Sequence, residues 1–449
     1  MAREPWEKPV IVMQVTGLMN KFGRRSARKA IKDIDGVLIS DLVAEYGSPL
    51  FIFSERTIRE KYREAKRVFS SRYPDVRFGW SYKTNYLDAI CAIFHQEGAL
   101  AEVVSEFEYA KARRLGVAGP DIFYNGPYKP DESLALAAKE GASIHIDNFN
   151  ELEALGRLAE AQKIKARAAL RLNLDAGIYP SWDRFGFNLE SGEAIEAARR
   201  IAGHEHIRLE GLHVHLGTYI LEPGAYATAA AKMVDLAATL KDRFGIEIGY
   251  LDLGGGFASQ STLHSQYLPA EEVSPTLNQY AEQICATLSK SRRDGQSLGL
   301  VLETGRALID EAGYLATTVV AEKRLPSGLR SLVIDAGVNI LFTSFWYKYK
   351  ISTTREIHGL QEELIIHGPL CMNIDVVRPS VMLPPVELGE TLLVHPVGAY
   401  NVTQWMQFIR MRPNVVLVGE DGSHELIREA ETIDDIVSRE RLPERLKLS

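Results

Sequence analysis

Eight short apolar segments recur through the first two-thirds of the sequence, and segments with the periodicity of amphipathic helices separate them. They are rich in β-branched and aromatic residues and occupy positions 78–83, 100–105, 122–126, 143–148, 167–173, 209–217, 249–256 and 299–306. Near-continuous apolar runs alternating with helices are typical of parallel strands buried on both faces. Eight such units predict a (β/α)8 barrel of the TIM type, although an open doubly wound sheet fits the same pattern.

The residues at the ends of these segments favour the barrel. They are Lys83, Ser105, Asn125, Asn148, Asn173, His215, the Gly254–Gly256 turn and Glu303. Polar residues at strand ends often do no more than turn the chain. In a barrel, however, all eight carboxyl ends meet at one mouth, where active sites lie. We therefore expect a site at this mouth.

The pattern changes near residue 307, beyond which strand-like segments follow one another with few helical stretches between them. This predicts an all-β second domain, a sandwich or a small barrel. The expected organisation is an N-terminal extension (1–33), a leading segment (34–49) that can join the β-domain, the barrel (50–307) and the β-domain (308–449).

Composition narrows the functional classes. The net charge of −7, without a long basic block, argues against a nucleic-acid-binding protein. The three cysteines, Cys91, Cys285 and Cys371, are too few and too scattered for a disulfide framework or a Cys-x-x-Cys metal site. We expect a reduced, cytoplasmic protein without a metal. The N-terminal apolar run is too short to span a bilayer and makes a poor signal peptide, so no membrane association is expected.

The segment LDLGGGF (251–257) is a candidate phosphate-binding corner. Three glycines after a buried strand let the backbone approach an anion and point N–H groups at it. A simple tight turn explains the glycines equally well, but this is the seventh strand, and barrel phosphate sites often use the loops after strands seven and eight. Arg306, shortly after the eighth strand, can pair with the same phosphate.

Lys83 ends the first strand, and an amine that is partly desolvated there should have a lowered pKa and attack carbonyls. A phosphate corner and such a lysine suit either a phosphosugar aldolase or a protein that binds pyridoxal 5′-phosphate (PLP). Glu303 favours PLP, because a carboxylate opposite the pyridine nitrogen keeps that nitrogen protonated. His215 suits a partner stacked on the ring, while His213, on the same strand face, is expected to be structural.

Seven ordered motifs resemble the fold-type III PLP-dependent decarboxylases, which include diaminopimelate and ornithine decarboxylases. The motifs are YKTN around Lys83, VVSEFEYA (103–110), HVHLGT (213–218), LDLGGGF, ETGR (303–306), GPLC (368–371) and GAY (398–400). Together with the segment 34–53, which resembles the diaminopimelate branch, the likeness spans roughly residues 34–435.

The resemblance implies that Lys83 carries PLP, that His215 stacks on its ring and that Glu303 pairs with its nitrogen. The phosphate contacts that it implies come from Gly254, Gly255, Gly256, Thr218, Arg306 and Tyr400, while Glu102 and Ser105 complete the cofactor site. Cys371 matches the cysteine that protonates the substrate carbon after decarboxylation. In the family that cysteine comes from the partner subunit, which implies a homodimer with shared active sites.

Two departures from the family concern the substrate. Met372 stands where relatives have an acid that holds a distal ammonium, and Thr343 stands where the diaminopimelate branch has an arginine for a carboxylate. Further candidate substrate contacts are Arg171, Arg184, Tyr347 and Asp375, and Trp182 and Trp346 can line a more aromatic pocket.

We therefore expect an amino-acid decarboxylase that acts on a specialised or conjugated amino acid other than diaminopimelate. Decarboxylation of meso-diaminopimelate to lysine is the alternative. An amino-acid racemase or a catalytically silent PLP-binding protein comes third, because Glu303 disfavours racemisation and both Lys83 and Cys371 are present. The aldolase hypothesis accounts neither for Cys371 nor for the β-domain.

Overall fold

The computed structural model describes residues 30–178, 182–290 and 298–448. Eight parallel strands form a closed barrel, because β8 pairs with β10 as well as with β7. They are β4 (Val76–Ser81), β5 (Leu100–Val103), β6 (Ile122–Tyr124), β7 (Ser143–Ile146), β8 (Ala166–Asn173), β10 (Ile207–Val214), β11 (Tyr250–Asp252) and β13 (Gly299–Thr304). Each coincides with one of the eight apolar segments. The barrel prediction is therefore confirmed, and the open-sheet alternative is wrong.

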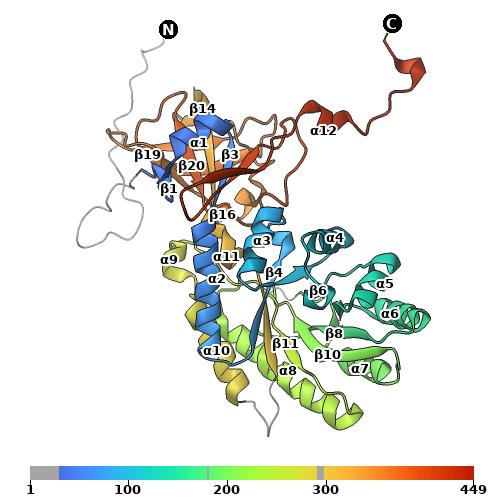
Figure 1. Ribbon diagram of the computed structural model, residues 1–449. Coiled ribbons are helices and arrows are strands. Elements are labelled where there is room, and N and C mark those ends of the chain that lie inside the picture. Colours follow the sequence, from blue (N-terminus) through green and yellow to red (C-terminus); the bar gives the residue numbers. More distant parts are fainter. Residues whose placement is uncertain (1–29, 179–181, 291–297, 449) are drawn as a thin grey trace, which may run out of the picture.

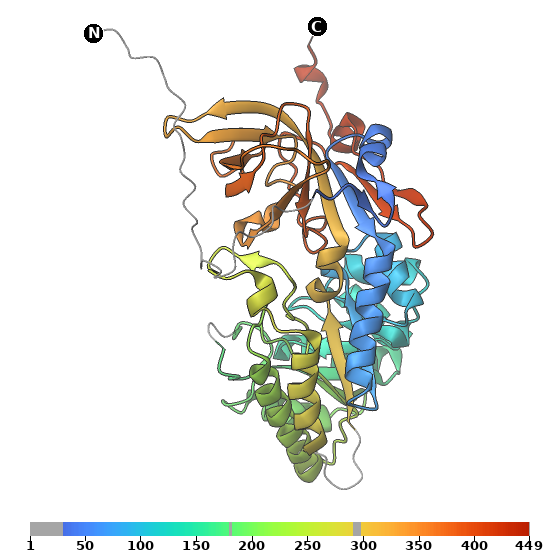
Figure 2. The same ribbon diagram turned by 90° about the vertical axis from the view of Figure 1, so that its left-hand side faces the viewer.

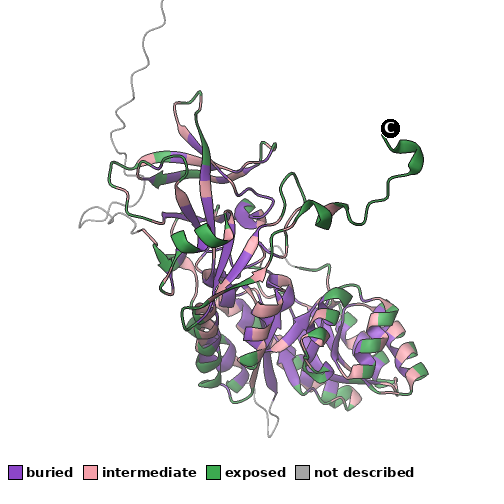
Figure 3. Cartoon of the chain, turned by 45° about the horizontal axis from the view of Figure 1, so that its top comes forward, coloured by how far each residue is buried: buried purple, intermediate pink, exposed green. Residues whose placement is uncertain are grey.

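Helices cover the outside of the barrel (Figure 1). They are α2 (Glu55–Ser70), α3 (Asp88–Gln96), α4 (Glu106–Arg114), α5 (Asp131–Glu140), α6 (Phe149–Gln162), α7 (Glu193–Ala202), α8 (Pro223–Phe244) and α10 (Leu277–Lys290), with the short α9 (Ala270–Val273) and α11 (Arg306–Ile309) near the mouth. Their packing follows from amphipathic spacing: α2 buries Ile58, Tyr62, Ala65, Val68 and Phe69 along one face. Figure 3 shows the result, with buried strands inside and exposed outer helix faces.

The second domain is all-β, as expected, and Figures 1 and 2 show it stacked on one end of the barrel. Its main sheet has the order β19 (Val376–Leu383), β18 (Glu362–His367), β15 (Arg330–Ile334), β14 (Gly313–Arg324), β3 (Leu50–Ser54), β21 (Asn414–Val418) and β22 (His424–Arg428). Strand β20 (Thr391–His395) pairs with β14 and with β17 (Lys350–Thr353). The remaining described elements are β1 (Asp33–Ile34), β2 (Val37–Leu38), α1 (Ile39–Tyr46), β9 (Phe187–Asn188), β12 (Thr262–Leu263), β16 (Tyr347–Lys348) and α12 (Ile433–Val437).

One expected domain boundary is wrong. Residues 50–54 were assigned to the barrel, but strand β3 pairs with β14 and β21 in the β-domain sheet. Its five residues are all buried there, in the sheet interior, and the barrel begins only with α2 and β4. The leading segment packs on this sheet without joining it, since Ile34, Ile39 and Leu42 cluster with Leu50 and Ile52 while β1 pairs only with β2. The chain therefore enters the barrel from the β-domain and returns to it after β13.

None of the helices in the part of the chain that the structure describes combines the length and the apolar character that a bilayer-crossing helix requires.

Candidate active site

A cavity of about 590 Å³ lies at the mouth of the barrel. Residues that follow strands β4, β5, β6, β8, β10, β11 and β13 line it from below, and the β-domain closes it from the other side. The β-domain contributes Thr343, Trp346, Tyr347, Tyr400 and Gln404. The site is therefore formed where the two domains meet, and the predicted barrel mouth is the place of most candidate residues.

Lys83 enters the cavity from the short 3-10 turn Tyr82–Thr84 that follows β4. Its Nζ lies 3.2 Å from Oε1 and 3.1 Å from Oε2 of Glu102, a fully buried residue on β5. Burial lowers the pKa of Lys83, but the charges of Glu102 and Glu303 outweigh burial and hold that pKa above its ordinary value. The expected lowered pKa is thus wrong for the protein alone, because a buried carboxylate pairs with the amine.

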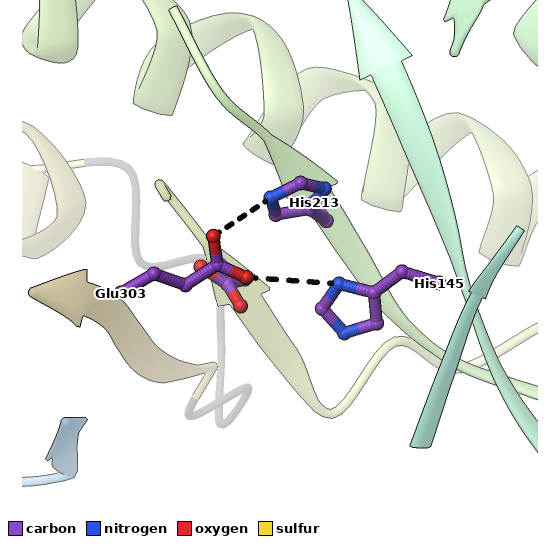
Figure 4. A group of neighbouring side chains, drawn as sticks. His145, His213 and Glu303 are labelled. Atoms are coloured by element: carbon purple, nitrogen blue, oxygen red, sulfur yellow. Dashed lines mark ion pairs between the residues drawn. The ribbon is translucent and has the colours of Figure 1, made fainter. Parts of the chain in front are cut away.

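Glu303, near the end of β13, lines the same cavity. Asn125 connects the two acids, since its Nδ2 donates to Oε1 of Glu102 at 3.0 Å and also to Oε1 of Glu303. Figure 4 shows two imidazole rings directed at the Glu303 carboxylate: Nε2 of His213 at 3.3 Å and Nδ1 of His145 at 3.9 Å. Burial lowers the pKa of both histidines far below its ordinary value, so both rings are neutral.

His215 and the triple-glycine corner form one side wall of the cavity. Nδ1 of His215 accepts a hydrogen bond from the N–H of Gly255 at 3.2 Å, and burial lowers the pKa of His215 to about 3. Neither Gly255 nor Gly256 has room for a side chain, because a Cβ would collide with the carbonyl oxygens of Glu303 and Gly217, respectively. Gly256 also adopts a φ of +91°. The corner therefore presents bare backbone to the cavity.

Arg306 adds a buried positive charge beside that corner. Its Nη1 lies 3.3 Å from Oδ2 of Asp310, and its guanidinium lies over the rings of Tyr347 at 4.4 Å and Tyr400 at 5.0 Å. Burial lowers the pKa of Arg306, but the Asp310 charge outweighs burial, so the guanidinium remains charged. Its Nε has no hydrogen-bond partner among the described residues. Thr218 also lines this part of the cavity.

These groups fit PLP. An amine, an opposed carboxylate, a neutral imidazole and an anion-binding corner with a partly unsatisfied guanidinium match the aldehyde, ring nitrogen, ring face and phosphate of that molecule.

Two residues predicted to hold the cofactor do not line the cavity. The hydroxyl of Ser105 caps helix α4 by accepting the N–H of Glu108 at 3.2 Å. Gly254 turns the backbone just below the corner, and its N–H donates to Oδ1 of Asp252 at 2.8 Å. The structure therefore shows Ser105 in an ordinary role of a polar residue that follows a strand: it caps the next helix.

The predicted substrate residues divide into two groups. Arg171, Thr343 and Tyr347 line the cavity, as do Trp182 and Trp346. Nη1 of Arg171 lies 3.5 Å from Oδ1 of Asp147, and the Thr343 hydroxyl is 3.1 Å from Oδ1 of Asn401. Arg184 is exposed, stacks on Phe185 at 4.5 Å and is not among the lining residues.

Cys371, Met372 and Asp375 all lie outside the cavity of their own chain. Cys371 is exposed on the loop between β18 and β19. Asp375 is buried beneath that loop and accepts backbone N–H groups from Val338 at 2.8 Å and from Leu370 at 2.7 Å. Both carboxylate oxygens hold the loop in shape, which argues against the predicted role of Asp375 as a substrate contact.

Sequence reasoning missed several cavity residues, among them Phe185 and Gln404. It expected Asn125 at the mouth as a strand end but gave that residue no role in the site. Sequence reasoning also assigns His213 a structural role, whereas the structure brings its ring to Glu303.

The profile of the family described as "Pyridoxal-dependent decarboxylase, pyridoxal binding domain" matches residues 55–310. The diaminopimelate decarboxylase of Methanothermobacter thermautotrophicus is 30% identical over 428 residues, with 92% of this chain and 96% of that protein covered. The crystal structure of diaminopimelate decarboxylase from M. jannaschii in complex with L-lysine superposes with a TM-score of 0.85 at 28% identity, covering 92% of this chain and 97% of that one.

A third relative has a different name: the L-glutamyl-[BtrI acyl-carrier protein] decarboxylase of Niallia circulans is 26% identical over 423 residues, with 90% of this chain and 96% of that protein covered. The family profile covers more than half of the chain, and the matches to whole relatives extend through the β-domain. The cavity's donor set agrees with the cofactor in the family's description. This chain belongs to the pyridoxal-dependent decarboxylase family.

Proposed function

We propose that this enzyme removes the α-carboxylate of an amino acid with PLP attached to Lys83. The observation that carries the assignment is that Lys83 and Glu303 line one cavity and are connected through Glu102 and Asn125. When bound, PLP supplies a ring that accepts the electron pair left behind when the carboxylate departs as CO₂.

The surrounding residues orient this chemistry. Glu303 would hold a proton on the ring nitrogen, while the neutral imidazole of His215 would pack against the ring without adding charge. The corner at Gly255 and Gly256 and the free Nε of Arg306 would anchor the phosphate. Each of these groups is buried or partly buried, so water is largely excluded from the reacting atoms.

We further propose that the active enzyme is a homodimer in which Cys371 serves the partner's cavity. The supporting observation is that Cys371 is exposed and lies outside its own cavity, although its loop is anchored by the buried Asp375. A thiol on a rigid, exposed loop is suited to deliver a proton across a subunit interface to the substrate Cα. Phe345 and Trp346 are also exposed at the rim of the cavity region.

The first substrate to test is meso-diaminopimelate. The relatives named diaminopimelate decarboxylase support this alternative better than they support the specialised substrate that the sequence favoured. A cation for a substrate carboxylate is present in the cavity as Arg171.

A substrate without charged distal groups is the second candidate, and the uncharged residues Met372 and Thr343 favour it. Such a substrate could be an amino acid joined to a carrier, as in the name of the Niallia circulans relative. An exposed aromatic rim at Trp182 and Trp346 suits a bulkier conjugate.

The deciding experiment measures CO₂ released from meso-diaminopimelate, L-lysine, L-ornithine, L-glutamate and an L-glutamyl pantetheine thioester by PLP-loaded protein. We expect the highest kcat/KM with meso-diaminopimelate. Preference for the thioester would establish the second candidate instead. Absence of CO₂ with every compound, while substrate α-hydrogen exchanges with solvent, would contradict decarboxylation as the reaction.

A further inference from the structure

Four ionisable groups cluster at the part of the cavity wall that Glu303 and His213 form. They are His145 on β7, His213 on β10, Asp252 on β11 and Glu303 on β13, and one side-chain atom of each lies within 4.8 Å of the others. All four side chains are buried. Figure 4 shows the two histidine rings on one side of the Glu303 carboxylate. Nothing in the proposed function uses Asp252.

We propose that Asp252 is a positioning residue that keeps its proton and donates a hydrogen bond from Oδ2 to Glu303, so that the two carboxyl groups carry one negative charge between them. This inference rests on the proposed role of Glu303. Its consequence is a fixed orientation of the Glu303 carboxylate, with one oxygen held by the acid below and the charge directed at the cofactor's ring nitrogen.

The hydrogen bonds of Asp252 distinguish its two oxygens. Oδ1 accepts the N–H of Gly254 at 2.8 Å. Oδ2 accepts no hydrogen bond from any described residue. An ionised oxygen buried without a donor would be costly, whereas a protonated one needs an acceptor, and the Glu303 carboxylate lies in the same cluster, whose side-chain atoms are within 4.8 Å of one another. The pKa of Asp252 is consistent with this, because it is raised well above its ordinary value. Burial is the largest cause, followed by the charge of Glu303 and a hydrogen bond to Glu303.

Among the residues that the structure describes, no cation is left to neutralise a second carboxylate at this position. His145 and His213 are neutral because burial lowers their pKa values. The nearby cations have acid partners of their own: Lys83 pairs with Glu102, Arg171 with Asp147 and Lys129 with Glu151. A single charge shared by Asp252 and Glu303 therefore matches the single proton on a pyridine nitrogen.

The test compares Asp252→Asn with Asp252→Ala. The asparagine amide can reproduce both contacts, since its oxygen can accept from Gly254 and its NH₂ can donate to Glu303. We expect PLP to bind Asp252→Ala roughly 10-fold or more weakly, and the asparagine variant to restore the dissociation constant to within about threefold of wild type. Turnover should follow the same order. A purely structural role would show in the melting temperature but would not demand a donor at this position.

An infrared spectrum of the protein, with and without PLP, reports directly whether the Asp252 carboxyl group is protonated. A protonated carboxyl group has a C=O stretching band that an ionised one lacks. We expect this band in the wild type at pH 8.5 and its loss in Asp252→Asn. Burial raises the pKa of Glu108 to about 7, so at pH 8.5 Glu108 is ionised and does not contribute to the band. Because a neutral acid costs stability above the ordinary Asp pKa, the melting temperature of Asp252→Asn at pH 8.5 should equal or exceed that of the wild type.

Three results would overturn the inference. They are absence of the band in the wild type, equal loss of PLP affinity in both variants, and a stoichiometric divalent metal in the purified wild type that Asp252→Asn lacks. The proposed function fails in a different way. Wild-type turnover in Glu303→Gln would refute the role of Glu303, whereas the infrared band alone decides whether Asp252 keeps its proton.

Discussion

The mouth of the barrel gathers its reactive groups in one cavity of a single chain, whereas the loop of residues 368–375 carries its cysteine on an exposed surface. Lys83 donates a hydrogen bond to Glu102, and Asn125 donates hydrogen bonds to both Glu102 and Glu303. Among the described residues, no hydrogen bond links the Cys371 thiol in this way, whereas the buried Asp375 below it accepts N–H groups from Val338 and Leu370.

This difference indicates that cofactor binding depends on the fold of one chain, whereas the proposed protonation of the substrate depends on the assembly of two chains. Folding of one chain is sufficient to assemble the groups that hold the cofactor. In the proposed function, the proton donor comes from a second chain. Four changes test this contrast, and they are given in order of expected effect.

Lys83→Ala should abolish the reaction at the barrel mouth. Removing the proposed attachment point should lower the rate of CO₂ release roughly 10³-fold or more, because the amine has no substitute in the cavity floor. The measurement is CO₂ release with the best substrate, with the absorbance of bound PLP recorded in parallel. Lys139→Ala, at an exposed position on α5, is the matched control and should retain wild-type turnover.

Cys371→Ala should lower turnover by about 10²-fold, because a general acid contributes on that order. PLP affinity should be unchanged, since the thiol lies outside the chain's own cavity. The exposed cysteine is matched by the buried Cys285 on α10, and Cys285→Ala should retain turnover.

Mixing inactive Lys83→Ala with Cys371→Ala under conditions that exchange subunits should restore roughly a quarter of wild-type activity, because half of the dimers are mixed and each has one intact site. No recovery despite demonstrated exchange would mean that the thiol acts within its own chain or not at all.

Asp375→Ala should destabilise the β-domain rather than alter substrate binding. Two buried N–H groups, of Val338 and Leu370, would lose their acceptor, at a cost of roughly 2–4 kcal/mol in the free energy of unfolding. Urea unfolding measures that cost, and Glu387→Ala, at an exposed position, serves as the control. A variant of wild-type stability with a raised KM would restore Asp375 as a substrate contact.

Glu108→Gln should change how stability depends on pH near the barrel mouth. Burial raises the pKa of Glu108 from about 4.5 to about 7, while its carboxylate accepts the N–H of Val104 at 2.8 Å. As pH rises from 4.5 to 7, the unfolded chain releases this proton and the folded chain keeps it, so the free energy of unfolding falls by roughly 3 kcal/mol. The glutamine variant should lack this fall. Glu106→Gln, exposed on the same helix, should retain it.

The barrel and most of its mouth could be predicted from sequence because both depend on local patterns. A strand buried on both faces shows in its own residues, and topology then places the end of each strand at the mouth. Lys83, His215 and Glu303 were found in this way, and all three line the cavity. The glycine corner was found because a positive φ and the absence of room for a Cβ restrict the residue type directly.

The rest depends on contacts between residues far apart in the chain. The pKa of Lys83 is raised by the charge of Glu102, 19 residues away, which outweighs the desolvation that its place at a strand end suggested. Strand β3 belongs to the β-domain because its partners β14 and β21 come more than 250 residues later. Asp375 holds a loop through Val338, 37 residues earlier. No local pattern encodes such pairings.

The most direct test is to identify the lysine that carries the cofactor. PLP-loaded protein is treated with borohydride, which fixes the cofactor covalently to that lysine, and the digested peptides are sequenced by mass spectrometry. The account predicts a phosphopyridoxyl group on Lys83 in nearly all molecules. Labelling of another lysine, such as the buried Lys129, with Lys83 left unmodified, would contradict it.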